Sequence, residues 1–552
     1  MKLSVIIHVS FIFLPIWGIN GKTLESEGSP TVEIPDGKLL GTNGVTDKGT
    51  RYTAFRGIPY AQPPIGDLRF SSPVKNSNWN GYWDATNDPS PCVQGFGDNV
   101  RGSEDCLYIN VYAPENAHNL SVMVWIHGGA FTGGDSSYDS YAPDFLLDEN
   151  VVFVSFNYRL GVLGFLSTEN KVVSGNWGLK DQVLALQWAR ENIEYFGGNS
   201  KRITIFGESA GGAAVSYLVQ IPQAQGLFDA AIVQSGNSLN LWSLTTRARN
   251  AAFRVGTNLG IFALTASTLV KRLRNVDAYD LQSSAMTVLT RVYLTNPLRG
   301  LPWAPCIEVD SPDAVFTQKS DDYLRSGQFP SKVPLMIGFT SNEAGHAHGL
   351  PELLRQYLLL FDVANTNLVP YSLTSSSIRK VLAASQIKRN FFGTTAIRRQ
   401  FNEVVHFINT DQFTRGALRF AENVQPFVSA VYFYVFGYIG QITGENPYDG
   451  AGHAEELFYL FKQNGDYSEK DIVVREKLTK LWTNFAKYFN PTPTSEDKLD
   501  NLTWPKVDLN NGNIDFVWLN YTLTTDINPD NENYQFYKEI FDSYGGKSYS
   551  TY

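Results

Sequence analysis

The sequence predicts a doubly wound α/β fold, in which helices cover both faces of a large and mostly parallel sheet. Short apolar runs recur along the chain with helical patterns between them, and this alternation is typical of such folds. Several runs are apolar on both faces, as buried parallel strands must be. The expected strands span residues 122–126, 151–156, 203–206, 230–233, 333–337 and 431–435.

Helical spacing of apolar residues predicts helices over residues 179–193 and 474–489 that lie on the sheet. The stretch from Leu244 to about Gln425 is mostly helical in pattern. The part up to Tyr112 is rich in Pro, Gly and Asn, which predicts short antiparallel strands and loops. With no clear linker and no internal repeat, residues 22–552 are expected to form one domain.

The composition indicates a globular protein with a substantial core. Hydrophobic residues make up 43% of the chain and charged residues 18%, which makes disorder improbable. The net charge is −9 and there is no Lys/Arg-rich block, so the sequence argues against nucleic acid or an anionic membrane as the partner. A neutral or cationic ligand fits this charge better.

Residues 1–21 have the pattern of a secretory signal peptide. Lys2 is followed by a mostly apolar run from Leu3 to about Trp17, and then by the small residues Gly18 and Gly21. The run is too short for a typical membrane span, and no later segment offers 18 uninterrupted apolar residues. We therefore expect the protein to be secreted to the extracellular space without a stable membrane anchor.

Two further features fit an oxidising, secretory route. Asn119, Asn501 and Asn520 each begin an Asn-X-Ser/Thr triplet and are candidate glycosylation sites. Cys92 and Cys106 lie close together in a loop rich in Gly and Asp, which suggests a disulfide closing a short loop. Cys306 is then left over, and we expect it to be a buried free thiol.

Ser209 is the candidate nucleophile. It lies in Gly207-Glu208-Ser209-Ala210-Gly211, a Gly-x-Ser-x-Gly motif between a strand pattern and a helical one. In that context the serine sits on a strained turn, and the small residues around it relieve crowding. The start of the following helix directs backbone N–H groups toward the serine, which favours a developing negative charge there.

A serine needs a neighbouring base, and His453 is the best candidate among the seven histidines. In hydrolases with this motif the nucleophile comes first in the chain, the acid second and the base third, which removes His118 and His127. His453 lies in a loop after the predicted strand 431–435. His346 and His348 are expected to be solvated loop residues, and His406 an ordinary residue of a helix.

Glu343 is the candidate acid. It follows the predicted strand 333–337 and a polar turn, and a glycine comes soon after it. Its task would be to hold the imidazole in the right tautomer and to stabilise the imidazolium. Glu308, Asp310 and Asp313 satisfy the same chain order, but none follows so clear a strand.

Acyl transfer also requires donors for the oxyanion of the tetrahedral intermediate. The predicted strand 122–126 runs into His127-Gly128-Gly129-Ala130-Phe131, a glycine turn whose amides can point into a cavity. The motif around Ser209 itself supplies the amide of Ala210.

Two stretches have the form of family signature motifs, 206–212 (Phe-Gly-Glu-Ser-Ala-Gly-Gly) and 103–111 (Ser-Glu-Asp-Cys-Leu-Tyr-Ile-Asn-Val). In both, the chain resembles the type-B carboxylesterases, a family that includes cholinesterases and insect esterases. Similarity extends to residues 55–64, 157–161, 175–182 and 233–236, and so to nearly the whole mature chain.

This resemblance implies an α/β-hydrolase fold and a serine esterase that needs no metal or cofactor and acts on small-molecule esters. The residues implied are a triad of Ser209, Glu343 and His453, oxyanion-hole amides of Gly129, Ala130 and Ala210, and a disulfide between Cys92 and Cys106. By the same matching, Glu208 and Ser235 support the triad and Trp242 forms the wall of the acyl pocket, with an ordinary buried serine and core tryptophan as the alternatives for the last two.

The substrate is less clearly indicated. Cholinesterases carry a tryptophan between the two cysteines that stacks on the quaternary ammonium, and the segment from Cys92 to Cys106 has none, so choline esters are not expected as preferred substrates. The chain most resembles secreted insect esterases, including those that degrade odorants and pheromones or detoxify. Juvenile hormone esterase is an alternative, although such enzymes typically carry Gln in place of Glu208. A catalytically silent adhesion protein is the alternative from another class, and a lipase or amidase is a third.

Overall fold

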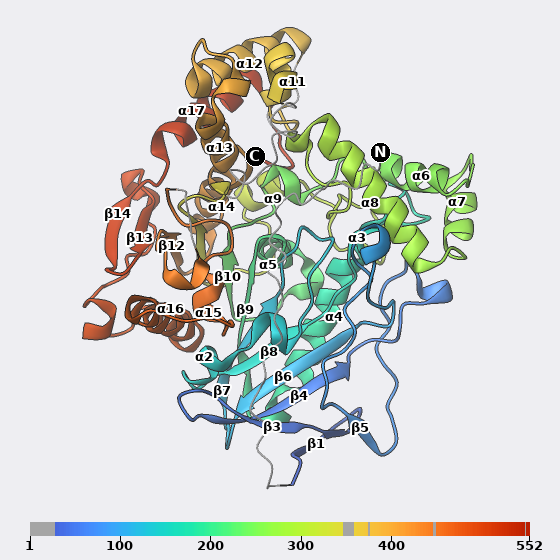
Figure 1. Ribbon diagram of the computed structural model, residues 1–552, viewed down its shortest axis with the longest axis vertical. Coiled ribbons are helices and arrows are strands. Elements are labelled where there is room, and N and C mark those ends of the chain that lie inside the picture. The colour runs from blue at the N-terminus through green and yellow to red at the C-terminus, as the bar shows by residue number, and fades with distance from the viewer. Residues whose placement is uncertain (1–27, 346–357, 374–375, 445–448, 547) are drawn as a thin grey trace.

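The computed structural model describes residues 28–345, 358–373, 376–444, 449–546 and 548–552, and its centre is a twisted sheet of eleven strands (Figure 1). All six predicted strands are present, and the predicted signal peptide lies outside the described residues. The strands of this sheet are β3 (Thr42–Val45), β4 (Arg51–Pro59), β6 (Tyr108–Pro114), β7 (Leu120–Ile126), β8 (Val152–Phe156), β9 (Gly198–Glu208), β10 (Ala230–Gln234), β11 (Leu335–Thr340), β12 (Val431–Phe436), β13 (Asp515–Leu519) and β14 (Thr524–Ile527).

The strand order is β14-β13-β12-β11-β10-β9-β7-β8-β6-β4-β3. Neighbours from β8 to β13 are parallel, and antiparallel strands flank them at both edges. Because β7 lies between β8 and β9, the chain reverses its direction of travel across the sheet at β7. Ligands of open α/β sheets bind outside the carboxyl ends of the strands at such a reversal.

Helices cover both faces of the sheet, and most of those between β10 and β12 form an upper layer (Figure 1). A second sheet joins β1 (Thr31–Ile34), β2 (Gly37–Leu40) and β5 (Tyr82–Asp84). The helices are α1 (Tyr138–Tyr141), α2 (Asp144–Leu147), α3 (Gly161–Phe165), α4 (Trp177–Asn192), α5 (Ala210–Gln220), α6 (Ala248–Asn258), α7 (Ala266–Leu273), α8 (Ala278–Thr295), α9 (Ser320–Arg325), α11 (Leu359–Val363), α12 (Ser377–Phe392), α13 (Phe401–Asn409), α14 (Arg415–Val424), α15 (Leu457–Leu460), α16 (Glu469–Tyr488) and α17 (Asn531–Tyr544). The predicted helical stretches are thus confirmed.

The central strands bury both faces, and their alternating side chains feed two separate cores. On β7, Val122, Val124 and Ile126 belong to the larger core, which includes residues of α4 and α5. Met123 and Trp125 belong to the smaller core, together with residues of α2 and α16. This explains why the sequence of β7 is continuously apolar rather than alternating.

A buried ion pair joins the loop after β8 to α4. Arg159 Nε and Nη2 donate to the two carboxylate oxygens of Asp181, at 2.8 and 2.7 Å, and the Arg159 amide donates to the same carboxylate at 3.0 Å. Arg159 Nη1 also donates to the carbonyl of Ser71. Both side chains are almost completely buried, so the pair fixes the geometry of two motifs that the sequence singled out.

The three cysteines behave as predicted. Cys92 and Cys106 form a disulfide. Cys306 is a buried free thiol, and burial raises its pKa to about 12, which keeps it protonated and unreactive at neutral pH.

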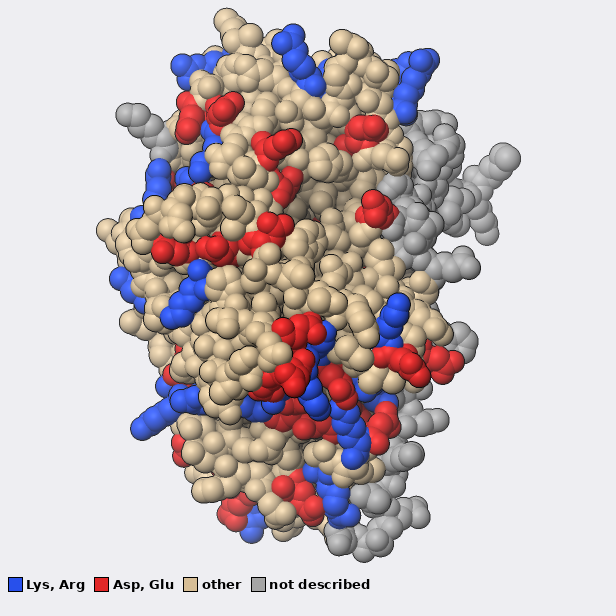
Figure 2. Space-filling view, turned by 90° about the vertical axis from the view of Figure 1, so that its left-hand side faces the viewer, with Lys and Arg blue, Asp and Glu red and all other residues tan. Residues whose placement is uncertain are grey.

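The surface of the molecule mixes charges of both signs. Over the middle of the face in Figure 2, red and blue side chains intermingle. Asn119 and Asn501 are exposed and Asn520 is half-buried, so glycosylation of these asparagines stays a prediction that their positions permit. Among the described residues, no helix combines the length and the apolar character needed to cross a bilayer.

Replacing Asp181 by Asn should lower the free energy of unfolding by about 3–5 kcal/mol, because the buried guanidinium of Arg159 would lose its counter-charge. Chemical denaturation followed by intrinsic fluorescence measures this change. Glu191→Gln is the matched control, since its ion pair with Lys75 is exposed and should contribute less than about 1 kcal/mol. Equal effects of the two substitutions would contradict the assigned role of the buried pair.

Candidate active site

The predicted site residues meet at the carboxyl ends of the central parallel strands. Ser209 follows β9 directly, Glu343 comes three residues after β11, and His453 lies in the long loop after β12. The glycine turn His127–Phe131 leaves the end of β7, the neighbour of β9. The site therefore lies at the reversal in strand order.

Ser209 occupies a strained backbone conformation, with φ 58° and ψ −121°, as expected for the turn between a strand and a helix. Its amide donates to the carbonyl of Gln234 at 2.9 Å. Two glycines make room for it: a Cβ at Gly211 would lie 2.0 Å from the carbonyl oxygen of Ile126, and one at Gly236 would lie 2.0 Å from the carbonyl oxygen of Ser209. Only glycine permits these backbone approaches.

A chain of hydrogen bonds links the three predicted triad residues. Ser209 Oγ lies 2.9 Å from His453 Nε2, and His453 Nδ1 is hydrogen-bonded to Glu343 Oε2. The other oxygen of Glu343 accepts the amide hydrogen of Thr340 at 2.8 Å. With Nδ1 donating to the buried carboxylate, Nε2 is left as the acceptor for the serine hydroxyl.

The rival candidates lie elsewhere or are engaged differently. His127 is buried and stacks on Tyr158, and His406 is an exposed residue of α13 beside Asn533. Glu308 is buried but forms an ion pair with Lys180 at 2.8 Å. Asp310, Asp313 and His118 are exposed, and His346 and His348 lie outside the described residues.

Two further carboxylates lie close to the imidazole. Glu208 Oε1 is 3.2 Å from His453 Nε2, on the same side as Ser209 Oγ. Glu456 is fully buried and accepts a hydrogen bond from the Gln234 side chain at 3.1 Å. Glu208 was predicted from the sequence and Glu456 was not, although its place three residues after His453 was a usable signal.

These carboxylates change the proton affinity of the site. Burial alone would lower the pKa of His453, but the negative charges of Glu208 and Glu343 outweigh this effect and raise it above the ordinary value. Burial, together with the neighbouring acidic groups, raises the pKa of Glu208 and of Glu456. The cluster therefore holds a proton readily near the serine and stabilises an imidazolium there.

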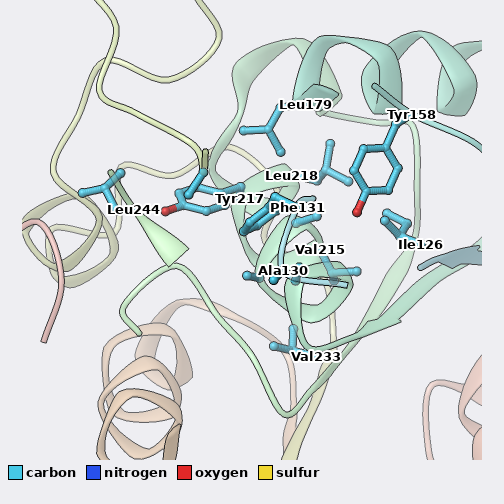
Figure 3. Packing of buried hydrophobic residues seen from close by; sticks show 14 of the residues in the cluster. Ile126, Ala130, Phe131, Tyr158, Leu179, Val215, Tyr217, Leu218, Val233 and Leu244 are labelled. Carbon is cyan, nitrogen blue, oxygen red and sulfur yellow. The ribbon is translucent and has the colours of Figure 1, made fainter. Parts of the chain in front are cut away.

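The glycine turn after β7 has the geometry of an anion-binding loop. Gly129, Ala130 and Phe131 have consecutive positive φ values of 102°, 55° and 58°, a conformation held by hydrogen bonds from Gly161 to Phe131 and from Thr132 to Gly129. Figure 3 shows Ala130 and Phe131 packed among core side chains that include Val215 of α5. Within the described chain no backbone carbonyl accepts the amides of Gly129 or Ala130, so both remain available to an oxyanion.

Two aromatic rings lie beside the triad. Trp242 is half-buried, and its ring reaches the close contact between Gly236 and Ser209, since a Cβ at Gly236 would lie 2.9 Å from Trp242 Cη2. Phe413 lies 5.9 Å from the Trp242 ring and 5.0 Å from the His453 ring, measured between centroids. The sequence predicted Trp242 but not Phe413, because nothing local marks a phenylalanine in a helical stretch as part of a site.

Phe413 owes its position to a π-helical turn, Thr410–Thr414, between α13 and α14. The hydroxyls of Thr410 and Thr414 donate to the carboxylate of Asp530, at 2.9 and 2.6 Å, and the indole of Trp242 donates to the carbonyl of Gln412 at 2.9 Å. Such turns often occur at functional sites. Here the turn connects the two aromatic residues beside the triad, Trp242 and Phe413, to Asp530 in the segment before α17.

Ser235 is buried next to this region and has a positive φ of 51°. Its amide donates to the carbonyl of Gly338. Its hydroxyl has no hydrogen-bond partner among the described residues, so its predicted support of the triad is not visible as a direct contact.

The known proteins that this chain is similar to include esterases, in sequence and in structure. The model of the carboxylesterase family matches residues 28–537. Juvenile hormone esterase of Tribolium castaneum is 33% identical over 89% of this chain and 88% of its own, and esterase E4 of Myzus persicae is 31% identical over 84% and 87%. Among solved structures, a juvenile hormone esterase from Manduca sexta with OTFP covalently attached superposes with a TM-score of 0.82 at 26% identity, covering 93% of this chain and 100% of that one.

Replacing Glu208 by Gln should lower the pKa of His453, because the substitution removes the negative charge that most raises it. NMR titration of ¹³C-labelled imidazoles measures the shift, with the His453 signal assigned from His453→Ala. A His453 pKa equal to that of the wild type would show that Glu208 does not act on the imidazole.

Proposed function

Because the chain belongs to the carboxylesterase family and is a serine carboxylesterase, we propose that it hydrolyses its ester through a Ser209–His453–Glu343 triad and a covalent acyl-enzyme. The observation that carries this proposal is the unbroken chain of hydrogen bonds from Ser209 Oγ through both nitrogens of His453 to Glu343. Each group has the partner that its role requires.

In the acylation step, His453 Nε2 takes the proton of Ser209 as Oγ attacks the ester carbonyl carbon. The carbonyl oxygen gains a negative charge, and the amides of Gly129, Ala130 and Ala210 donate to it. Imidazolium formed at His453 is stabilised by Glu343 at Nδ1. The imidazolium then gives its proton to the departing alkoxide, so that the C–O bond breaks and an alcohol leaves.

Deacylation repeats these steps with water in place of the serine. His453 removes a proton from the water, and the hydroxide attacks the acyl carbon. The second tetrahedral intermediate collapses, Ser209 recovers its proton from His453 and the carboxylic acid leaves. Glu208, at 3.2 Å from Nε2, supports both steps because its charge favours the protonated imidazole.

The site supports an enzyme more strongly than a silent binding member of the family. All three triad positions hold competent side chains and are in contact. The free amides of the strained turn after β7 are a further feature that a purely adhesive protein would not need.

We propose that the enzyme is secreted and acts on esters in detoxification or in the removal of odorants or pheromones. The signal-peptide pattern of residues 1–21 and the disulfide support secretion, since disulfides persist in oxidising compartments. Hydrolysis of juvenile hormone is the second candidate, favoured by the similarity to the Tribolium castaneum enzyme.

Ser209→Ala should lower kcat/KM for p-nitrophenyl acetate by about 10⁴-fold or more, because the covalent route is lost while binding is retained. Ser385→Ala, which changes an exposed serine on α12, should leave the rate unchanged. Mass spectrometry of the protein after treatment with an organophosphate should find the label on the peptide that contains Ser209. Activity retained by Ser209→Ala, or a label elsewhere in the site, would refute the triad.

Trp242→Ala should enlarge the acyl side of the site and raise the ratio of kcat/KM for p-nitrophenyl butyrate over acetate by roughly tenfold. Trp79→Ala is the control, since Trp79 is also half-buried and also donates its indole N–H to a backbone carbonyl, that of Lys38, but in the small sheet. An unchanged ratio would assign Trp242 to the core rather than to the pocket.

A further inference from the structure

The helices α11 and α12 carry aliphatic side chains that face solvent. Both helices pack against the turn Asn365–Leu368 and lie side by side at the upper end of the molecule (Figure 1). We call six side chains on them the α11–α12 apolar face, and their exposed fractions run from 41% for Leu360 to 79% for Val363. Its members are Leu359, Leu360, Val363, Ile378, Val381 and Leu382.

The exposed side chains of α12 do not lie at a frayed end. They form one side of a helix whose opposite side is packed against the protein. Ala383, Ala384, Ile387 and Phe391 are buried on the opposite side, and Phe391 packs edge-on against Phe407 of α13. The spacing of Ile378, Val381 and Leu382 places these three side chains together on the outer side of the helix. Helix α12 therefore has two apolar sides, one buried against the protein and the other exposed to solvent.

Basic side chains accompany this face. Between residues 377 and 400 the chain has no Asp or Glu and has six basic residues. Arg398 forms an ion pair with Asp362 at 3.0 Å, whereas no ion pair within the described structure engages the other five. The five are Arg379, Lys380, Lys388, Arg389 and Arg399. Arg379, Arg389 and Arg399 are exposed, whereas Lys380 has the spacing of the buried side and is not counted in the basic rim. The net charge of −9 for the whole chain conceals this local excess of positive charge.

We propose that the α11–α12 apolar face and its basic rim dock on an anionic lipid surface, such as a bilayer or droplet that holds lipophilic esters. Aliphatic side chains next to Lys and Arg are the composition of helices that lie in a membrane interface. Arg and Lys would meet the lipid phosphates while Ile378, Val381 and Leu382 enter the acyl region.

The shape and the composition of the face favour lipid over protein. The helices project from one end of the molecule (Figure 1), and blue side chains lie at the same upper end in Figure 2, with red side chains close below them. Protein interfaces are enriched in aromatic residues and Met and depleted of Lys, whereas the α11–α12 apolar face is entirely aliphatic. A second copy of this chain is acidic overall and would be attracted to the basic rim. It would also bring its own α11–α12 apolar face to the contact.

The α11–α12 apolar face is connected to the candidate active site by packed helices. Packing leads from α12 to α13, and α13 continues into the π-helical turn that places Phe413 beside His453. Adsorption through α12 would therefore hold the catalytic machinery at a fixed height and orientation above the lipid. This proposal concerns where the enzyme works and does not depend on which residues form the triad.

Co-flotation of the full-length protein with vesicles tests the proposal. Vesicles of phosphatidylcholine alone are compared with an equimolar mixture of phosphatidylcholine and phosphatidylserine, at low and at high salt. We expect the wild type to float with the mixed vesicles at low salt and to be released at high salt. Arg379→Ala/Arg389→Ala, at two exposed positions of α12, should lower the partition constant roughly 20-fold, at about fivefold for each charge.

The triple variant Ile378→Ser/Val381→Ser/Leu382→Ser should also abolish flotation. Its matched control is Ile65→Ser/Val172→Ser/Ile527→Ser, which changes exposed aliphatic residues outside α11 and α12 and should float like the wild type. Hydrolysis of soluble p-nitrophenyl acetate should be equal in all variants, which shows that they are folded.

Three flotation results would overturn the proposal: no flotation of the wild type, flotation that both α12 variants retain, and equal flotation with neutral vesicles. A wild type that sediments as a dimer, and as a monomer once Ile378, Val381 and Leu382 are replaced, would likewise overturn it and assign the face to a second copy of the chain. Loss of esterase activity on its own would bear on the proposed triad and not on docking.

Discussion

The active site depends on how closely three backbone segments can approach one another. The turn that carries Ser209 is wedged between the end of β7 and the segment after β10, and no side chain fits at Gly211 or at Gly236. This crowding holds Ser209 in a conformation that an isolated peptide would avoid. The strain is sustained by the sheet, whose parallel neighbours on both sides fix the ends of β7, β9 and β10.

Around this rigid turn, the protein concentrates negative charge in a place with little solvent. Glu208, Glu343 and Glu456 are all buried, and three carboxylates within one pocket would repel each other strongly if each were ionised. Among the residues that the structure describes, His453 is the basic group that contacts Glu208 and Glu343, so a protonated imidazole stabilises the cluster best. In the proposed mechanism an imidazolium arises as the serine attacks, and these carboxylates stabilise it.

The sequence predicted the parallel centre of the sheet well because each of its strands is buried on both faces and reads as an apolar run. It did not mark β13 and β14, which lie at the edge where burial is weaker, β14 being exposed throughout. The juxtaposition of Ser209, Glu343 and His453 could be predicted because each follows a strand in a fixed chain order, and the three side chains are in contact, while their catalytic roles stay a proposal. Phe413 could not be predicted, because its position arises from contacts between segments distant in sequence, such as the anchoring of its turn by Asp530.

The helices between β10 and β12 have a consequence for how such a protein can change over time. They supply the aromatic wall and the exposed face of α12, while Ser209, Glu343 and His453 are placed by strand ends. Substitutions in this insertion can therefore change the substrate range and the proposed docking surface while Ser209, Glu343 and His453 keep their positions. In this architecture the substrate range can diversify through mutations in the helices between β10 and β12, while selection keeps the residues at the strand ends unchanged.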